Sequence, residues 1–359
     1  MIGFLVFLLF FLLPSGWAKH WIVDQSLVNG VLVDYLMPDL WLQDILAFAF
    51  IILNRERLKR LIKDKVVLVS LGLIIIPIFF SSVPLVSLVY FSRFLLAVTV
   101  GYLLIKIFKG KDGKKVRRIA LIGLLGALVW TGALAFFQMI NQGTVFGWWF
   151  LGEPIFNSGS GGVKKIEIFN KIVVAPMATF PHSNVLAGFS LLGLAIILRE
   201  KKTKWRFWAV LFSFVSILGS LSFYTILLKP FSFLKSPSLW RRWELIKISL
   251  RMIKDNFLFG VGWGSFVKKM PEYWQEMKTN FRFLQPVHNI FLIVPSEIGF
   301  IGLLGIVGIV GRLFKRVLRK ENILFLSICF LISLIDHYFW TTTQGIYTAF
   351  FFLSFQISC

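Results

Sequence analysis

Ten apolar segments run along the chain, and short polar connections separate most of them. A helix needs about 20 apolar residues, within a range of roughly 17 to 25, to cross a bilayer. The pattern predicts an all-α fold, a polytopic transmembrane helix bundle of about ten spans that forms one integral membrane domain over residues 1–359. The predicted spans lie near residues 2–18, 38–53, 66–81, 84–105, 119–140, 183–198, 207–228, 289–311, 322–339 and 341–358. A cleaved signal peptide is the alternative for residues 1–18.

Positive charge gathers in alternate connections between these segments. Four connections hold 23 of the 39 Lys and Arg residues, and they cover residues 54–65, 106–118, 199–206 and 312–320. Cytoplasmic loops of membrane proteins are enriched in Lys and Arg. The net charge of +22 therefore reflects membrane topology and predicts no nucleic-acid partner. The remaining connections are predicted to lie outside the cell membrane; they are residues 19–37, 82–83, 141–182, 229–288 and a turn near Thr341.

Composition supports the membrane assignment. Hydrophobic residues make up 57% of the chain, charged residues only 16%, and the mean hydropathy is +0.79. Soluble domains are about half apolar and about a quarter charged. The two cysteines, Cys329 and Cys359, provide neither a disulfide framework nor a metal-ligand spacing.

The outer connection 229–288 is patterned like a folded segment. Ser236-Pro237 is a good helix start, since Ser caps a helix and Pro fits its first position. An apolar stripe and a basic face follow, which predict an amphipathic helix on the membrane surface or against the bundle. The stripe comprises Leu239, Trp243, Ile246, Leu250 and Ile253. Arg242 lies beside this stripe, where it could reach a phosphate; its alternative role is to snorkel into lipid headgroups.

Glycines and a histidine complete this outer segment. Gly260, Gly262 and Gly264 either form a turn or offer backbone N–H groups to an anion. His288 then stands where the next span begins. Histidines at a membrane boundary are often merely interfacial, and His182 and His337 also lie near span ends, so position alone does not single out His288.

Two further features place ionisable groups near or inside spans. Arg93 lies in the middle of a predicted span, where a charge either serves function or has an internal partner. It therefore either contacts a lipid-linked substrate or pairs within the protein. Asp336-His337, near another span end, is either a proton site or an interfacial pair at the outer surface beside Trp340.

Three motifs together resemble the O-antigen ligase and O-antigen polymerase superfamily. His288-Asn289, followed by Gly299 and Gly302, is similar to the family's His-Asn motif. The helix that begins at Arg242 and the glycine segment after it resemble the family's sequence before that histidine. The run Thr179-Phe-Pro-His-Ser-Asn184 resembles an earlier signature at the start of a span. All three occur in the family's order, over roughly residues 119–345.

The resemblance implies an all-helical protein of the bacterial cytoplasmic membrane that moves glycans from a polyprenyl-diphosphate lipid on the outer face. It places the family's catalytic His and Arg on His288 and Arg242, with Arg241 as the alternative one position away, and it makes 229–288 the catalytic loop. Asn289 is then a substrate-binding candidate.

The chain departs from the family pattern in two ways. Relatives usually carry an Arg just before the Thr-Phe signature, whereas this chain reads Val174-Ala-Pro-Met-Ala178 there, so Lys171 is the nearest cation for a second phosphate contact. Relatives also tend to have two further spans before the Arg helix. Losing a pair of spans keeps His288 on the outer side.

The implied chemistry is an inverting transfer to an acceptor hydroxyl of a glycan, lipid or protein. Arg242 binds the diphosphate bidentately, and His288 accepts the hydroxyl proton. An unperturbed His has a pKa of about 6.5, so the rate is expected to rise with pH through about 6 to 7. No cofactor is expected, and no metal, because the outer loops show no carboxylate cluster. A transporter or lipid-linked-glycan flippase is the alternative function, and a non-catalytic scaffold is a third.

Overall fold

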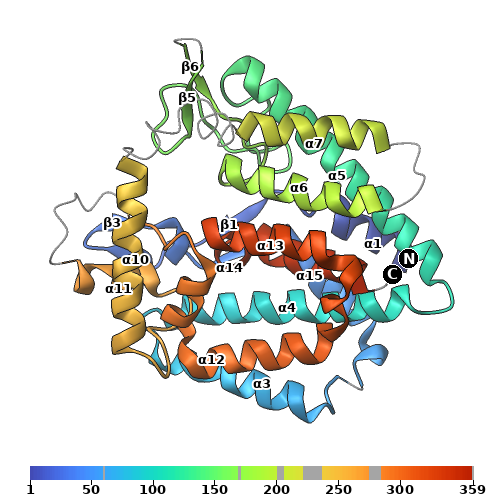
Figure 1. Cartoon of the computed structure of the whole chain (residues 1–359), viewed down its shortest axis with the longest axis horizontal. Coiled ribbons are helices and arrows are strands. Elements are labelled where there is room, and N and C mark those ends of the chain that lie inside the picture. Colours follow the sequence, from blue (N-terminus) through green and yellow to red (C-terminus); the bar gives the residue numbers. More distant parts are fainter. Residues whose placement is uncertain (60, 169–170, 200–205, 221–236, 275–283, 358–359) are drawn as a thin grey trace.

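The protein is described by a computed structural model that covers residues 1–59, 61–168, 171–199, 206–220, 237–274 and 284–357 (Figure 1). A helix stands at each of the ten predicted spans. In chain order these helices are α1 (Ile2–Phe11), α2 (Leu42–Leu53), α3 (Lys65–Ile75), α4 (Pro84–Phe108), α5 (Gly113–Asn141), α6 (Ser183–Arg199), α7 (Arg206–Ser220), α12 (Ile290–Phe314), α13 (Ile323–Ile335) and α15 (Thr343–Ile357). Among the described residues, three more α-helices lie between them: α10 (Pro237–Asp255), α11 (Phe266–Tyr273) and α14 (Tyr338–Thr341).

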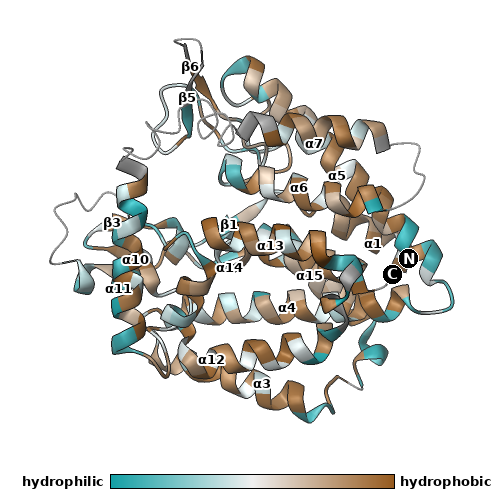
Figure 2. Ribbon diagram, viewed as in Figure 1, coloured by the Kyte–Doolittle hydropathy of each residue, from teal (hydrophilic) through white to brown (hydrophobic). Residues whose placement is uncertain are grey.

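Helix length separates these elements into two groups. In the part of the chain that the structure describes, α4, α5 and α12 are long and apolar enough to cross a membrane by themselves. Six other apolar stretches are shorter, α1 and α13 among them. The count of ten spans therefore stays a prediction. Figure 2 shows hydrophobic residues along the parallel helices α3, α4 and α12, and hydrophilic residues on α10 and at the opposite end of the bundle.

The first helix ends at Phe11, before Pro14, and is therefore shorter than the predicted span 2–18. The carbonyl groups freed there are satisfied by side-chain amides from other helices. Gln43 donates to the carbonyls of Leu12, Leu13 and Ser15, and Gln344 donates to those of Pro14, Ser15 and Thr179. Non-helical backbone at membrane depth is tolerated only where protein groups satisfy it in this way.

The predicted all-α fold needs a correction, because the described residues form three small antiparallel sheets in the connections before α2 and between α5 and α6. Strand β1 (Ala18–His20) pairs with β4 (Asp39–Trp41), and β2 (Leu27–Val28) pairs with β3 (Val31–Leu32). Strand β5 (Lys165–Ile168) pairs with β6 (Lys171–Val174). The backbone groups of these connections hydrogen-bond to one another across short antiparallel ladders, since a backbone polar group that is shielded from water needs a partner. The protein is mainly helical, with hairpins in its connections.

The bundle has two chemically different ends. The N- and C-termini and the connection from α4 to α5 lie at one end (Figure 1). Contacts of basic side chains belong to the same end: Arg312 binds Asp64 at 2.7 Å, Arg199 binds Asn322 at 2.6 Å, and Arg117 lies over the Phe355 ring. Helix α10 and the β5–β6 hairpin lie at the opposite end, and α10 runs across the direction of α4 and α12 (Figure 1).

Helix α12 is broken at Gly299, and the glycine segment after α10 fills the break. Gly299 has φ 60° and ψ −170°, a conformation that is essentially restricted to glycine. The N–H groups of Val261 and Gly262 donate to the carbonyls of Ser296 and Glu297, and the carbonyls of Phe257 and Leu258 accept from the N–H groups of Phe300 and Ile301. The backbone amides of this segment thus bind helix α12. These contacts fit the prediction that the glycines form a turn. The N–H groups of Val261 and Gly262 already donate to helix α12 and are not available to an anion.

Replacing Gly299 with alanine is expected to destabilise the protein. A Cβ atom there would lie 2.5 Å from the backbone N of Gly260 and 2.5 Å from the carbonyl O of Leu258. Overpacking typically costs about 1–3 kcal/mol, and the sparsely populated backbone conformation of Gly299 adds about 1–3 kcal/mol for a residue other than glycine. Thermal unfolding of the detergent-solubilised protein should show a clear drop in Tm.

Gly311→Ala is the matched control, because Gly311 lies in the same helix and an added Cβ meets nothing within 4 Å. Its Tm should stay close to that of the wild type. Equal Tm values for both variants would contradict the role of the break.

Candidate functional site

Helix α10 packs on α12 through a face different from the predicted apolar stripe. Trp243 and Leu250 of that stripe are more than half exposed, at 58% and 52%. The buried side chains are instead Leu245, Ile248, Ser249 and Met252. Ser249 and Ser296 share a hydrogen bond of 2.8 Å, and small side chains let the two helices approach closely. Trp243 and Leu250 therefore face away from the bundle, whereas Ile246 packs against the core, and the membrane-surface position of α10 stays a prediction.

Arg242 extends from α10 to the end of helix α13. Its Nη1 donates to the carbonyl O of Ile335 at 3.0 Å, next to Asp336. Burial lowers the pKa of the Arg242 guanidinium, and the Asp336 carboxylate opposes this effect. The contacts with Ile335 and Asp336 belong to Arg242. Arg241, the alternative residue, is half-buried on the same helix.

His288 is held in place by the cap of helix α12. Asn289 is the N-cap residue, and its side chain accepts a hydrogen bond from the N–H of Leu292. The Asn289 amide also donates to the carbonyl of Leu334 in α13 at 3.2 Å. The His-Asn pair therefore joins the start of α12 to the end of α13. Asn289, a predicted substrate-binding residue, has a structural role in these contacts.

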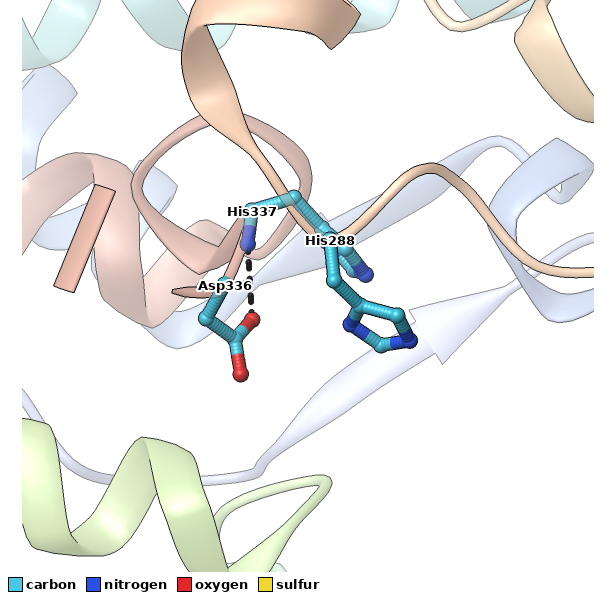
Figure 3. Close-up of side chains that lie close together, drawn as sticks. All are labelled: His288, Asp336 and His337. Carbon is cyan, nitrogen blue, oxygen red and sulfur yellow. Dashed lines mark hydrogen bonds between the residues drawn. The ribbon is translucent and has the colours of Figure 1, made fainter. Parts of the chain in front are cut away.

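His288 lies against Asp336 and His337 (Figure 3). The two imidazole rings are 4.9 Å apart between centroids, and one ring nitrogen of each histidine and one carboxylate oxygen of Asp336 lie within 4.8 Å of one another. The Asp336 carboxylate accepts from the backbone N–H of His337 at 2.7 Å, and His337 Nδ1 binds the hydroxyl of Thr341. His288 Nδ1 is buried without a hydrogen-bond partner. The cluster thus pairs an imidazole with a nearby carboxylate.

The protonation of His288 differs from the sequence expectation. Burial lowers its pKa to about 3, and the neighbouring His337 and Arg242 act in the same direction, while Asp336 opposes them. The imidazole is therefore neutral at ordinary pH and able to accept a proton. A titration near 6 to 7 is not expected for the empty site, because the sequence-based value took no account of burial or of the neighbouring charge.

Two more side chains, His182 and Tyr35, lie near this cluster, and the sequence analysis assigned neither of them to it. His182 precedes α6 and interacts electrostatically with Asp336, Lys164 and Arg242. Tyr35, in the 3₁₀ helix η2 (Asp34–Leu36), contacts the His337 ring at 5.9 Å between centroids. The sequence held one signal for this grouping. Because successive predicted spans cross the membrane in opposite directions, residues 182, 288 and 336 are predicted to lie on the same side.

Arg93 pairs with groups inside the protein, which was one of the two roles predicted for it. It is 3% exposed, and its guanidinium binds Asp39 at 2.6 Å and Asp44 at 3.0 Å. Tyr347 also donates to Asp44. These bonds tie α4 to β4 and α2, which favours a structural role over contact with a lipid diphosphate. The side chain of Lys171 lies outside the described residues.

The donor set of His288, Asp336 and His337 is of a kind that can bind a metal ion, and the sequence analysis did not foresee it. The charges around it are of both signs. The positive charge of Arg242 acts on both histidines, Lys164 acts on His182 and Arg242, and the carboxylate of Asp336 opposes these cations at His288 and His182.

Fold and site together define a multi-helix membrane protein with a cluster of polar and charged side chains at one end of the bundle. Residues 172–307 match the sequence model of a family described as O-antigen ligase. This match supports the O-antigen ligase superfamily for the chain, and it implies activity of the O-antigen ligase or polymerase type. The matched residues include Arg242 and His288, whereas Asp336 and His337 follow them in the chain. No curated protein matches the chain.

Proposed function

We propose that the protein transfers a glycan from a polyprenyl-diphosphate-linked donor to an acceptor hydroxyl, as a surface-polysaccharide ligase or polymerase. The observation that carries this proposal lies within the family-matched segment. Arg242 and His288 are 46 residues apart in sequence, yet the charge of Arg242 acts directly on His288. In this proposal Arg242 is the cation that binds phosphate, and His288 is the neutral imidazole on which its charge acts.

The proposed reaction is a displacement at the anomeric carbon of the donor sugar. The acceptor oxygen forms a bond to this carbon while the bond to the diphosphate oxygen breaks, which inverts the configuration. The acceptor proton passes to His288, and the polyprenyl diphosphate leaves as an anion. Arg242 stabilises the charge that grows on the diphosphate, since a guanidinium binds phosphate bidentately and stays charged.

Asp336 supports the base in this scheme. Once His288 has accepted the proton, an imidazolium is buried beside a carboxylate whose oxygen lies within 4.8 Å of the ring nitrogen. A nearby opposite charge favours the charged form of an imidazole. The negative diphosphate acts in the same direction, so donor binding raises the basicity of His288 as the reaction begins.

The decisive experiment incubates the purified protein in lipid nanodiscs with a polyprenyl-diphosphate oligosaccharide and a choice of acceptors. Mass analysis should detect a glycosylated acceptor and released polyprenyl diphosphate. A repeating glycan acceptor identifies a polymerase, and a lipid or protein acceptor identifies a ligase. Donor translocation without any new glycosidic bond would instead support the flippase alternative and overturn the proposal.

The proposed location is the cytoplasmic membrane, with many passes and the site on the outer side. Basic connections gather at the end of the bundle that holds both termini, whereas α10 and the β5–β6 hairpin lie at the other end (Figure 1). Because cytoplasmic loops are the basic ones, the site end is assigned to the outside.

Single cysteines test this topology, after native Cys329 and Cys359 have been replaced. The variants Ser158→Cys and Lys254→Cys, at exposed positions of the site end, should react with a membrane-impermeant thiol reagent on intact spheroplasts. Lys111→Cys, exposed in a basic connection, should react only after lysis. Labelling in the reverse pattern would place the site inside and contradict the proposed donor.

A further inference from the structure

His337 is held in the tautomer that is typical of a metal ligand. The Thr341 hydroxyl donates its hydrogen to the carbonyl O of His337 at 3.3 Å, so the hydroxyl oxygen is left to accept. In the bond between Thr341 and His337 Nδ1, the proton therefore lies on Nδ1, and the lone pair of the ring lies on Nε2. Histidines that ligate metals almost always donate their other ring N–H to a polar group, which fixes the tautomer and the orientation of the ring.

The other two members of the cluster also have electron pairs available. His288 Nδ1 is buried and has no hydrogen-bond partner among the described residues. Asp336 uses Oδ1 to accept from the N–H of His337 at 2.7 Å, which leaves Oδ2 for another contact. One donor atom from each of the three side chains lies within 4.8 Å of the other two (Figure 3). Because buried polar atoms normally have a partner, the unpartnered nitrogen of His288 points to a ligand at this cluster.

The chemistry of the three donors selects among metal ions. Two imidazoles and a carboxylate suit zinc and the neighbouring transition metals, whereas magnesium and calcium prefer oxygen ligands. Zinc often has three protein ligands and a fourth, open position, and it lies about 2.0–2.2 Å from nitrogen and oxygen ligands. The three side chains therefore approach the ion by small rotations as it binds. Arg242, bound to the carbonyl next to Asp336, opposes the ion, and the Asp336 carboxylate attracts it.

We propose that His288, Asp336 and His337 form a zinc site whose occupation inhibits the protein. The inhibition rests on the proposed function, in which His288 accepts a proton. A neutral imidazole has a single basic nitrogen, so His288 cannot ligate an ion and accept a proton at the same time. The ion takes no part in the transfer. A chelator therefore leaves the ion-free protein unchanged and restores activity to protein that zinc has inhibited.

The first test measures ion binding without catalysis. The full-length protein, without a polyhistidine tag, is titrated with Co²⁺ in phosphatidylcholine nanodiscs, and the visible absorption bands of tetrahedral Co²⁺ report the site. The wild type should bind a single Co²⁺ ion and exchange it for Zn²⁺ but not for Mg²⁺. Thr341→Val leaves all three ligands in place and should weaken Zn²⁺ binding by about ten- to a hundredfold, the usual cost of losing a group that orients a ligand. Asp336→Asn, which keeps the shape of the side chain, should weaken it at least as much.

His20→Ala is the matched control, because His20 and Asp39 form another histidine–carboxylate pair, with 3.9 Å between Nδ1 and Oδ2. Its affinities for Co²⁺ and Zn²⁺ should equal those of the wild type. Two results would overturn the proposal. One is a wild type that shows no Co²⁺ bands. The other is unchanged binding in both Asp336→Asn and Thr341→Val, which would place the ion elsewhere.

The second test measures inhibition in the transfer assay. Zn²⁺ should lower transfer over the concentration range in which it binds, and EDTA should restore the rate. In Thr341→Val the inhibiting concentration should rise by the same factor as the dissociation constant. An unchanged inhibiting concentration would mean that Zn²⁺ acts on the donor diphosphate, and it would refute the proposal.

The two tests separate this proposal from the proposed function. Transfer that resists saturating Zn²⁺ would refute the inhibitory site and leave the glycan transfer standing. Conversely, a protein that binds Zn²⁺ through Asp336 and His337 but forms no product would refute the proposed function and leave the zinc site standing.

Discussion

Replacing His288 with alanine is expected to lower glycan transfer by about 10²–10⁴-fold, the range over which a positioned general base contributes. Expression and membrane insertion should stay intact, because the cap of α12 is made by Asn289 and not by the imidazole. Initial rates of transfer, measured in nanodiscs at saturating donor, give the effect. His20→Ala is the matched control, since His20 lies in the outer strand β1 and is half-exposed beside Asp39.

The pH dependence follows from the lowered pKa of His288. A group with a pKa of about 3 carries a proton only in strong acid, so the base is already neutral at pH 5. Between about pH 5 and pH 7, kcat/KM should therefore vary little, since no essential group of the free enzyme titrates there. A rise through pH 6 to 7 would show that the free enzyme keeps His288 near its ordinary pKa and would contradict the burial argument.

Two further variants separate a base from a hydrogen-bonding group. His288→Gln should be as inactive as His288→Ala, because an amide accepts no proton. Full activity in His288→Gln would reduce His288 to a residue that orients substrate. Asp336→Asn should lower kcat more than it changes the KM for the donor, since the carboxylate stabilises the imidazolium that forms during the reaction. A chelator is expected to have no effect on the wild type.

Replacing Arg242 has the second largest expected effect. Loss of a charge-assisted contact to the diphosphate costs about 1.5–3 kcal/mol, which corresponds to roughly ten- to a hundredfold in rate. Arg242→Lys should be impaired nearly as much as Arg242→Ala, because an ammonium group cannot bind phosphate bidentately. The transfer assay with the full donor measures both variants.

Arg241→Ala is the control for Arg242, because it removes the neighbouring arginine of the same helix. It should retain most of the wild-type rate. Loss of activity in Arg241→Ala alone would shift the catalytic assignment by one residue. Full activity in both variants would instead indicate that the arginines bind lipid headgroups.

The positions of the helices were predictable because apolar length and charge leave few arrangements in a bilayer. All ten predicted segments contain a helix, and the glycine spacing at Gly299 belongs to a recognisable motif. The lengths of the helices were less predictable. Helix α1 stops before Pro14 because Gln43 and Gln344, distant in sequence, satisfy the freed carbonyl groups. Hydropathy contains no information about such partners.

The candidate site, too, was predictable from the sequence only in part. Motif order in the sequence led to the prediction of Arg242 and His288, because those residue types carry the chemistry of phosphate binding and proton transfer, and their catalytic roles stay predictions. Only the tertiary structure placed Asp336, His337 and Lys164 near them. Only the tertiary structure showed that Arg93 forms ion pairs with Asp39 and Asp44. The physical reason is that a pKa, an ion pair or an anion site depends on distance and burial, and these arise when helices far apart in sequence pack at one end of the bundle.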